Sequence, residues 1–223
     1  TQGVSSAASD VYKRQAMIHG MIDSGKCAAS DITASVKTEK SAEECRNDLG
    51  INVTTDNISV VRSADVLFLA VKPQFFEEVI GQIKDEIADN VIIVSIAPGK
   101  ALSWFDEKFK RELKVIRTMP NTPAMVGEGM MGVCANTKVS DDELKMVEDL
   151  CSGFSKTEVV DEKLMDVVTA VSGSSPAYVF MFIEAMADAA VAGGMPRQKA
   201  YTFAAQAAVS YTHLRAHETL MNL

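Results

Sequence analysis

Three short apolar runs constrain the fold of this chain more than any other feature. They cover residues 65–71, 90–96 and 114–118. A strand that is apolar on both faces belongs to a buried parallel sheet. Helical patterns over 75–87 and 103–109 separate the runs, and this strand–helix alternation predicts a doubly wound α/β sheet.

The turns that follow these runs are rich in Pro, Gly and small residues. They read AVKP, IAPG and TMPNTPA. In open α/β sheets, ligands bind beyond the carboxyl ends of the strands. We therefore expect a cofactor to approach the backbone at these three turns.

Shorter elements are expected on either side of the apolar runs. Upstream, residues 16–25 read as the end of a helix, and residues 1–15 as a linker or tail. Downstream, Ser140 and Glu143 predict a capping box for a helix over 140–154. The other expected elements are strands near 31–34, 52–55, 133–135 and 158–160, helices over 38–49 and 58–63, and helical structure from 162 onward.

The stretch AVSGSSPAYVF over 170–180 combines small hydroxyl residues, glycine and Pro176, and it predicts an elbow that opens a helix. The helix that follows is apolar nearly all round, so we expect it to be buried in a core or in a subunit interface. Free backbone N–H groups at such an elbow can hold a carboxylate or phosphate. The alternative is a capped structural helix.

Composition excludes several classes of partner. A net charge of −8 without a basic run argues against nucleic acid. No apolar segment reaches the ~20 residues that span a bilayer, and no signal peptide is evident. Four scattered cysteines favour reduced thiols in a cytoplasm. His213 and His217 have helical spacing but lack further metal ligands, so no metal site is expected.

The sequence Gly127–Gly132 matches G-x-G-x-x-G formally. That fingerprint has to follow a strand and open a helix. Here it follows a Pro-rich loop and runs into a segment that reads as extended. We do not expect it to bind a dinucleotide.

Five stretches together give the chain a family resemblance over about residues 16–208. They are ADVLFLAVKP, VSIAPG, VIRTMPNTPA, VDEKLMDVVTAVSGSSPAYVFMFIEAMADAAV and GGMPR. The chain resembles pyrroline-5-carboxylate reductases. The resemblance implies a Rossmann domain over 16–160 and an all-helical domain over 161–208 that dimerises by interleaving helices. It also implies that NADPH or NADH gives a hydride to a cyclic imine, 1-pyrroline-5-carboxylate, to form L-proline in the cytoplasm.

The resemblance also implies site residues. A protonated imine is already electrophilic, so neither a catalytic acid–base side chain nor a metal is required. Pro73 and Pro123 could instead only end strands, and Glu162 could be a helix-start carboxylate. The positions matching cofactor contacts are Asn57, Ala70, Val71, Lys72, Pro73, Ile96, Ala97, Pro98, Asn121 and Thr122, and those matching substrate contacts are Glu162, Thr169, Ser174 and Pro176. The family more often has Ala where Pro98 stands.

Cofactor preference has a physical basis in the second strand. NAD-specific Rossmann sites place an acidic residue at its end to bond the ribose 2′-hydroxyl. Here Ser35, Lys37 and Thr38 stand there, with no carboxylate before Glu39. These residues can accommodate a 2′-phosphate, so we expect NADPH, with NADH possible.

The two flanks, 1–15 and 209–223, depart from the family pattern. The family begins with a strand and a G-x-G-x-x-G turn, and it continues beyond the equivalent of 208 to a loop that holds the substrate carboxylate. We interpret the chain as a chimeric fragment. It lacks the central strand of the family's sheet, which would lie in space between the strands at 31–34 and 65–71, and we therefore expect it to fold poorly. A non-catalytic module that binds dinucleotide or dimerises stays open as an alternative. A related β-hydroxyacid dehydrogenase is a weaker one.

Overall fold

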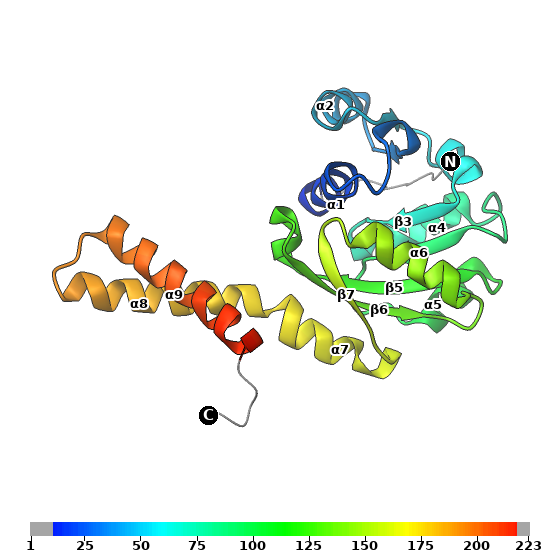
Figure 1. Ribbon diagram of the computed structural model, residues 1–223. Helices are drawn as coiled ribbons and strands as arrows, with labels where there is room; N and C mark the ends of the chain where they lie inside the picture. The colour runs from blue at the N-terminus through cyan, green and yellow to red at the C-terminus, as the bar shows by residue number, and fades with distance from the viewer. Residues whose placement is uncertain (1–10, 218–223) are drawn as a thin grey trace. The chain divides into compact units, whose positions relative to one another are not determined.

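The computed structural model describes residues 11–217, and the side chains of 14–209, of this 223-residue chain (Figure 1). The chain divides into two compact units. Unit one is Thr1–Gly173 and unit two is Ser174–Leu223. We describe each by its own elements.

Unit one contains two sheets. The smaller pairs β1 (Thr33–Ser35) with β2 (Asn52–Thr54) in parallel. The larger has the order β3-β4-β5-β6-β7. Its strands are β3 (Val66–Leu69), β4 (Ile92–Ser95), β5 (Lys114–Pro120), β6 (Gly129–Ala135) and β7 (Ser155–Val159).

The larger sheet is parallel except at one pair. Strands β3, β4 and β5 are parallel, as are β6 and β7, but β5 and β6 run antiparallel. A parallel connection needs a long crossover, whereas β5 and β6 are joined only by the short 3-10 helix η3 (Thr122–Val126). Gly129 and Gly132 lie within β6, so the rejected G-x-G-x-x-G indeed opens no helix.

Helices cover both faces of the larger sheet, which confirms the doubly wound architecture. Alternate residues of a strand point to opposite faces. Val66 and Phe68 join a buried cluster with α1, α2 and α6, whereas Leu67 and Leu69 join a second cluster with α4 and α5. The helices of unit one are α1 (Val11–Asp23), η1 (Ala29–Asp31), α2 (Glu39–Leu49), α3 (Asn57–Ser63), η2 (Pro73–Phe75), α4 (Phe76–Ile83), α5 (Leu102–Phe109), η3, α6 (Asp141–Cys151), η4 (Glu162–Leu164), α7 (Met165–Val168) and the π-helical turn η5 (Thr169–Gly173).

Local capping agrees with the sequence at two helices. Ser140 and Glu143 form the predicted capping box of α6, in which the Glu143 N–H donates to Ser140 Oγ at 3.3 Å. Gly50 ends α2 in the left-handed region, with φ of 65°. That region is open to glycine because it has no Cβ.

The prediction of a linker or tail over 1–15 is wrong for residues 11–15, which form the first turns of α1. Met17, Ile18 and Met21 of α1 are buried in the first cluster, and the helix extends back from this anchor to Val11. Residues 1–10 lie outside the described residues. The predicted helix end is confirmed, because α1 ends at Asp23 just before Gly25.

The two sheets of unit one share no hydrogen-bonded ladder within residues 11–217. The family's central strand, which would lie between β1 and β3, is expected to be missing from this chain, and the described residues contain no strand there. Apolar packing connects the sheets instead. Ala34 of β1 and Val53 of β2 belong to the same buried cluster as Val66, Phe68 and the helix α1.

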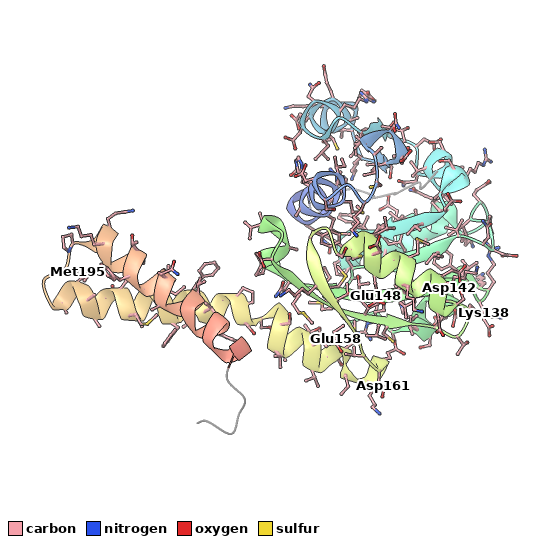
Figure 2. All side chains as sticks on the ribbon, in the orientation of Figure 1. Lys138, Asp142, Glu148, Glu158, Asp161 and Met195 are labelled. Atoms are coloured by element: carbon pink, nitrogen blue, oxygen red, sulfur yellow. The ribbon has the colours of Figure 1, made fainter. Side chains whose placement is uncertain are left out.

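Unit two is built from α8 (Ser175–Ala192) and α9 (Arg197–His217). Three alanines, Ala187, Ala200 and Ala204, form the buried contact between the two helices. Met195 lies in the turn that joins them (Figure 2), and Asp188 forms an ion pair with Arg197 across that turn. His213 and His217 belong to the last turns of α9, but their side chains lie outside the described part.

The compact units divide later than the boundary near Asp161 that the sequence predicts. Residues 162–173 are helical but belong to unit one, where Met165 is buried in the second cluster. Residues 162–192 also form a helical stretch long and apolar enough to pass as a membrane span by length and composition. The expectation that no segment reaches this length is therefore wrong, although such a stretch is weak evidence for a membrane.

Candidate dinucleotide and substrate site

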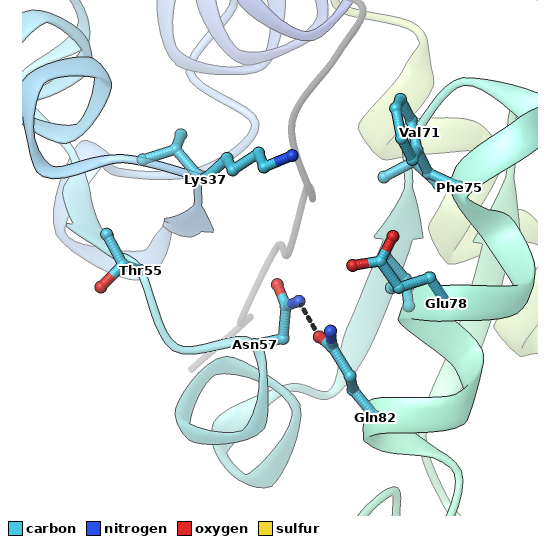
Figure 3. Close-up of a pocket in the computed structure, with 9 residues that line it drawn as sticks. Lys37, Thr55, Asn57, Val71, Phe75, Glu78 and Gln82 are labelled. Carbon is cyan, nitrogen blue, oxygen red and sulfur yellow. Dashed lines mark hydrogen bonds between the residues drawn. The ribbon is translucent and has the colours of Figure 1, made fainter.

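A cavity of about 230 Å³ opens at the carboxyl ends of β1, β2 and β3 (Figure 3). Parallel strands bring their carboxyl ends to the same edge, which is the usual ligand position in such sheets. The cavity is lined by Val36, Lys37, Thr55, Asn57, Val71, Phe75, Glu78, Val79 and Gln82.

The cavity joins three residues that the sequence analysis selected from separate segments. Lys37 follows β1, Asn57 opens α3 after β2, and Val71 follows β3. Lys37 Nζ lies 5.9 Å from the centroid of the Phe75 ring. Asn57 Nδ2 donates to Gln82 Oε1 at 2.7 Å, which fixes both amides at the cavity wall.

The other residues predicted from the same segments lie beside the cavity and do not line it. Ser35 is buried in β1, and Thr38 caps α2 by accepting a hydrogen bond from the Ser41 N–H at 3.2 Å. Ala70 is buried next to Val71, while Lys72 and Pro73 are exposed, with Pro73 opening η2. The structure thus places Lys37 and Val71 on the cavity and leaves these five residues adjacent to it.

The turn after β4 contains the next predicted cofactor contacts. Ile96 and Ala97 are buried, whereas Pro98 is exposed at the turn. The Ala97 N–H donates to Ser95 Oγ at 3.3 Å, which holds the turn against its strand. Gly99 follows with φ of 71°, a left-handed value that lets the chain turn into α5.

Asn121, at the end of β5, ties together two of the sequence motifs. Its Nδ2 donates to Ser172 Oγ at 3.2 Å, and its Oδ1 accepts the Met130 N–H at 2.9 Å. It therefore fixes the TMPNTPA turn to the AVSGSS segment and to β6. Thr122 is exposed at the start of η3.

Glu162 caps the neighbouring helix α5. Its Oε1 accepts a hydrogen bond from the Leu102 N–H at 2.6 Å and lies 3.4 Å from Nη1 of the buried Arg117. A carboxylate is stabilised at a helix N-terminus by the unpaired N–H groups there. Glu162 is therefore a helix-start carboxylate, as the alternative interpretation expects, but the helix whose N-terminus it binds is α5.

The predicted elbow over 170–180 is a π-helical turn. Residues 169–173 adopt this wider turn, and Thr169 Oγ1 donates to the Met165 carbonyl at 2.9 Å. The helical structure expected from residue 162 onward is therefore confirmed here, because the backbone stays helical from α7 through Gly173. Ser174 and Pro176 open α8 in unit two, with Pro176 in the first turn as predicted.

Sequence reasoning missed several residues of the site. Phe75, Glu78 and Gln82 recur at helical spacing and so share one face of the segment that includes α4. That spacing, directly after the AVKP turn, could have identified them. Ser172 lies in the predicted elbow but was not named as a contact residue, and Arg117 carried no comparable signal in the sequence.

The residues of the cavity fit the adenosine half of a dinucleotide. Lys37 offers a cation, Phe75 and Val71 offer apolar surface, and Asn57 offers a fixed amide. A pyrophosphate is usually held by a glycine turn before a helix. Helix α1 begins at Val11, and the residues before it lie outside the described part of the chain. The described residues also contain no cluster of three or more metal-ligating side chains.

Comparison with known proteins gives two family matches. Residues 162–222 match the pyrroline-5-carboxylate reductase dimerisation family, and residues 14–99 match a family described as NADP oxidoreductase, coenzyme F420-dependent. The dimerisation match extends past residue 208, where the sequence analysis ends the resemblance.

Individual relatives agree with these matches. The chain is 41% identical over 193 residues to the pyrroline-5-carboxylate reductase of Escherichia coli, covering 86% of this chain and 72% of that protein. It is 40% identical over 191 residues to the Methanosarcina acetivorans protein of the same name, with 86% and 71% covered.

Solved structures show the same fold. A pyrroline-5-carboxylate reductase from Coxiella burnetii superposes with a TM-score of 0.90 at 25% identity, over 98% of this chain and 81% of that one. The Plasmodium falciparum pyrroline carboxylate reductase with NADP bound gives a TM-score of 0.87 at 26% identity, over 98% and 80%. With 41% identity over 72% of a curated relative, this chain belongs to the pyrroline-5-carboxylate reductase family of NAD(P)-dependent oxidoreductases.

Proposed function

We propose that this chain binds NADPH at the carboxyl ends of its parallel strands and reduces 1-pyrroline-5-carboxylate to L-proline. NADPH supplies the hydride when it is bound. The protein contributes positioning and electrostatics, because a protonated cyclic imine needs no nucleophile. No observation described above favours the weaker alternative, a related β-hydroxyacid dehydrogenase.

One observation carries this proposal. The two motifs most specific to the family, RTMPNTPA and SGSSPAYVF, are joined through the hydrogen bond from Asn121 to Ser172. That contact lies just after the carboxyl end of β5, on the edge where ligands bind in such sheets.

The proposed roles follow from these positions. Lys37 and Asn57 hold the adenosine end, and the turns at Val71 and Ala97 form the backbone surface on which the cofactor lies. Asn121 holds the turn beside the nicotinamide. On the substrate side, the proposed contacts are Glu162, Thr169, Ser174 and Pro176.

The protein is proposed to act as a homodimer or larger oligomer in the cytoplasm. The match of residues 162–222 to a dimerisation family supports self-association. The exposed apolar side chains of α8 supply a surface for a second copy.

A non-catalytic module is the second candidate. The separate β1–β2 sheet favours it, because within residues 11–217 no ladder connects that sheet to β3. Such a module would bind dinucleotide or dimerise without reducing the imine.

Fluorescence titration with NADPH, followed by imine-dependent oxidation of NADPH, tests both candidates on the full chain. The reductase proposal expects saturable binding and turnover, and Asn121→Ala should lower turnover about tenfold or more by loosening the turn. Asn52→Ala is the matched control, since Asn52 also donates to a backbone carbonyl but lies at the start of β2. Binding without turnover supports the module, and absence of binding contradicts both.

A further inference from the structure

The cavity at β1, β2 and β3 contains one cationic and one anionic side chain that the fold does not pair. Lys37 and Glu78 both line it. Within the described residues, neither side chain forms an ion pair, and Lys37 Nζ lies over the Phe75 ring. The adjacent Glu77 differs, because Lys108 Nζ lies 2.9 Å from its Oε1.

The two charged groups enter the cavity from different elements. Lys37 follows β1, and Glu78 lies in the first turn of α4. Figure 3 shows the ammonium and the carboxylate both directed into the same space, with Asn57 and Gln82 below them in this view. Charges left unpaired by the fold at a ligand pocket are available to the ligand.

The two groups favour opposite ligands. An ammonium favours the 2′-phosphate of NADPH, whereas a carboxylate accepts a hydrogen bond from the 2′-hydroxyl of NADH and repels a phosphate. The sequence rule for NAD sites considers only the end of the second strand. There the first carboxylate, Glu39, is bound to Arg46 by hydrogen bonds of 3.0 and 2.9 Å. Glu78 supplies a carboxylate to the cavity from another element.

We propose that Glu78 is a specificity-determining residue that limits the preference for NADPH over NADH, in opposition to Lys37. This inference rests on the proposed cofactor function. The cavity then accepts adenosine with either a phosphate or a hydroxyl at the 2′ position. Replacement of Glu78 shifts the balance toward the phosphate, and replacement of Lys37 shifts it toward the hydroxyl.

Calorimetric titration of the full chain with adenosine 2′,5′-bisphosphate and with AMP tests the proposal, because these probes occupy only the adenosine half. Glu78→Gln is expected to tighten the bisphosphate about three- to tenfold and to weaken AMP about threefold. Glu78→Lys is expected to tighten the bisphosphate further. Lys37→Met is expected to weaken the bisphosphate about tenfold and to leave AMP nearly unchanged.

Glu77→Gln is the matched control on the same helix, and it is expected to change neither affinity by more than about twofold. If both probes bind and Glu78→Gln behaves like Glu77→Gln, this inference is overturned and the proposed function stands. If neither probe binds to the unaltered chain, both are overturned.

Discussion

Unit one buries most of its large apolar side chains, whereas most of those described in unit two are exposed. Phe68 of β3 is 1% exposed between two layers of helices, while Phe182 of α8 is 57% exposed. Among the described residues of unit two, the buried apolar ones are three alanines, and larger apolar side chains pack against them only partly buried. Unit one therefore has the apolar core of an independent domain, and unit two has a surface that needs a partner.

This difference explains why a continuously apolar segment is buried within its own chain in unit one but is exposed in unit two. A continuously apolar strand is buried within its own chain by helices on both faces. A helix that is apolar nearly all round has no such cover in unit two, so burial has to come from another surface. The family match of residues 162–222 supports a second copy as that surface.

The strongest test of this contrast is a pair of phenylalanine truncations. Phe68→Ala is expected to lower the free energy of unfolding by about 3–5 kcal/mol, because it removes a buried ring and leaves a cavity. Phe182→Ala is expected to change it by less than about 0.5 kcal/mol at concentrations where the protein is monomeric. Urea denaturation measures both. Equal losses would contradict the division into a self-sufficient and a dependent unit.

The next test addresses the exposed face of α8. Phe180 is 64% exposed, and Phe180→Glu is expected to weaken self-association about thirtyfold, since a charge would have to be buried in an apolar interface. Sedimentation velocity over a concentration series measures the shift. Gln198→Glu adds the same charge near the α8–α9 turn and should have a smaller effect. If the unaltered chain is strictly monomeric at all concentrations, self-association through the exposed face of α8 is contradicted.

The smallest expected effect is a pH dependence of stability from the core of unit one. Burial raises the pKa of the Cys151 thiol from about 9 to about 12. The unfolded chain loses this proton first, so the thiol's contribution is complete below about pH 9 and is lost as pH rises toward 12. The free energy of unfolding should fall by at most about 1.4 kcal/mol per pH unit in that window.

Urea denaturation between pH 8 and pH 10.5 checks the effect as a difference between variants, because other groups titrate there too. Cys151→Ala is expected to have a shallower slope than the unaltered chain. Cys27→Ala serves as the comparison, because burial also raises the pKa of this half-buried thiol but the thiol is less enclosed, and a smaller change of slope is expected. Identical slopes for all three proteins would show that the Cys151 thiol is not held neutral by the fold.

Much of the fold was predictable because its signals are local. The apolar runs at 65–71 and 90–96 contain β3 and β4, and the Ser140 capping box begins α6. The antiparallel pairing of β6 was not predictable from its own residues, because it depends on how short the connection from β5 is. The compact units divide after Gly173 rather than near Asp161 for a related reason, since residues 162–173 are helical like unit two but pack in unit one.

The candidate site divides in the same way. Lys37 could be selected in advance because it stands just after a predicted strand, and Asn57 and Val71 because they match cofactor contacts of the family that the chain resembles. Glu78 could not, because its place opposite Lys37 depends on how α4 lies against the sheet. Arg117 was missed because its partner Glu162 is far from it in the sequence.

The sequence by itself determined the family, the strand–helix alternation and the turns where we propose that a ligand binds. These features depend on residue identity and on spacing over a few residues, and both can be read from the sequence without knowledge of long-range contacts. Only the tertiary structure decided which charges share the cavity, which helical residues belong to unit one and which apolar face is exposed. Those properties depend on distances between segments remote in the chain, and such distances are set by packing.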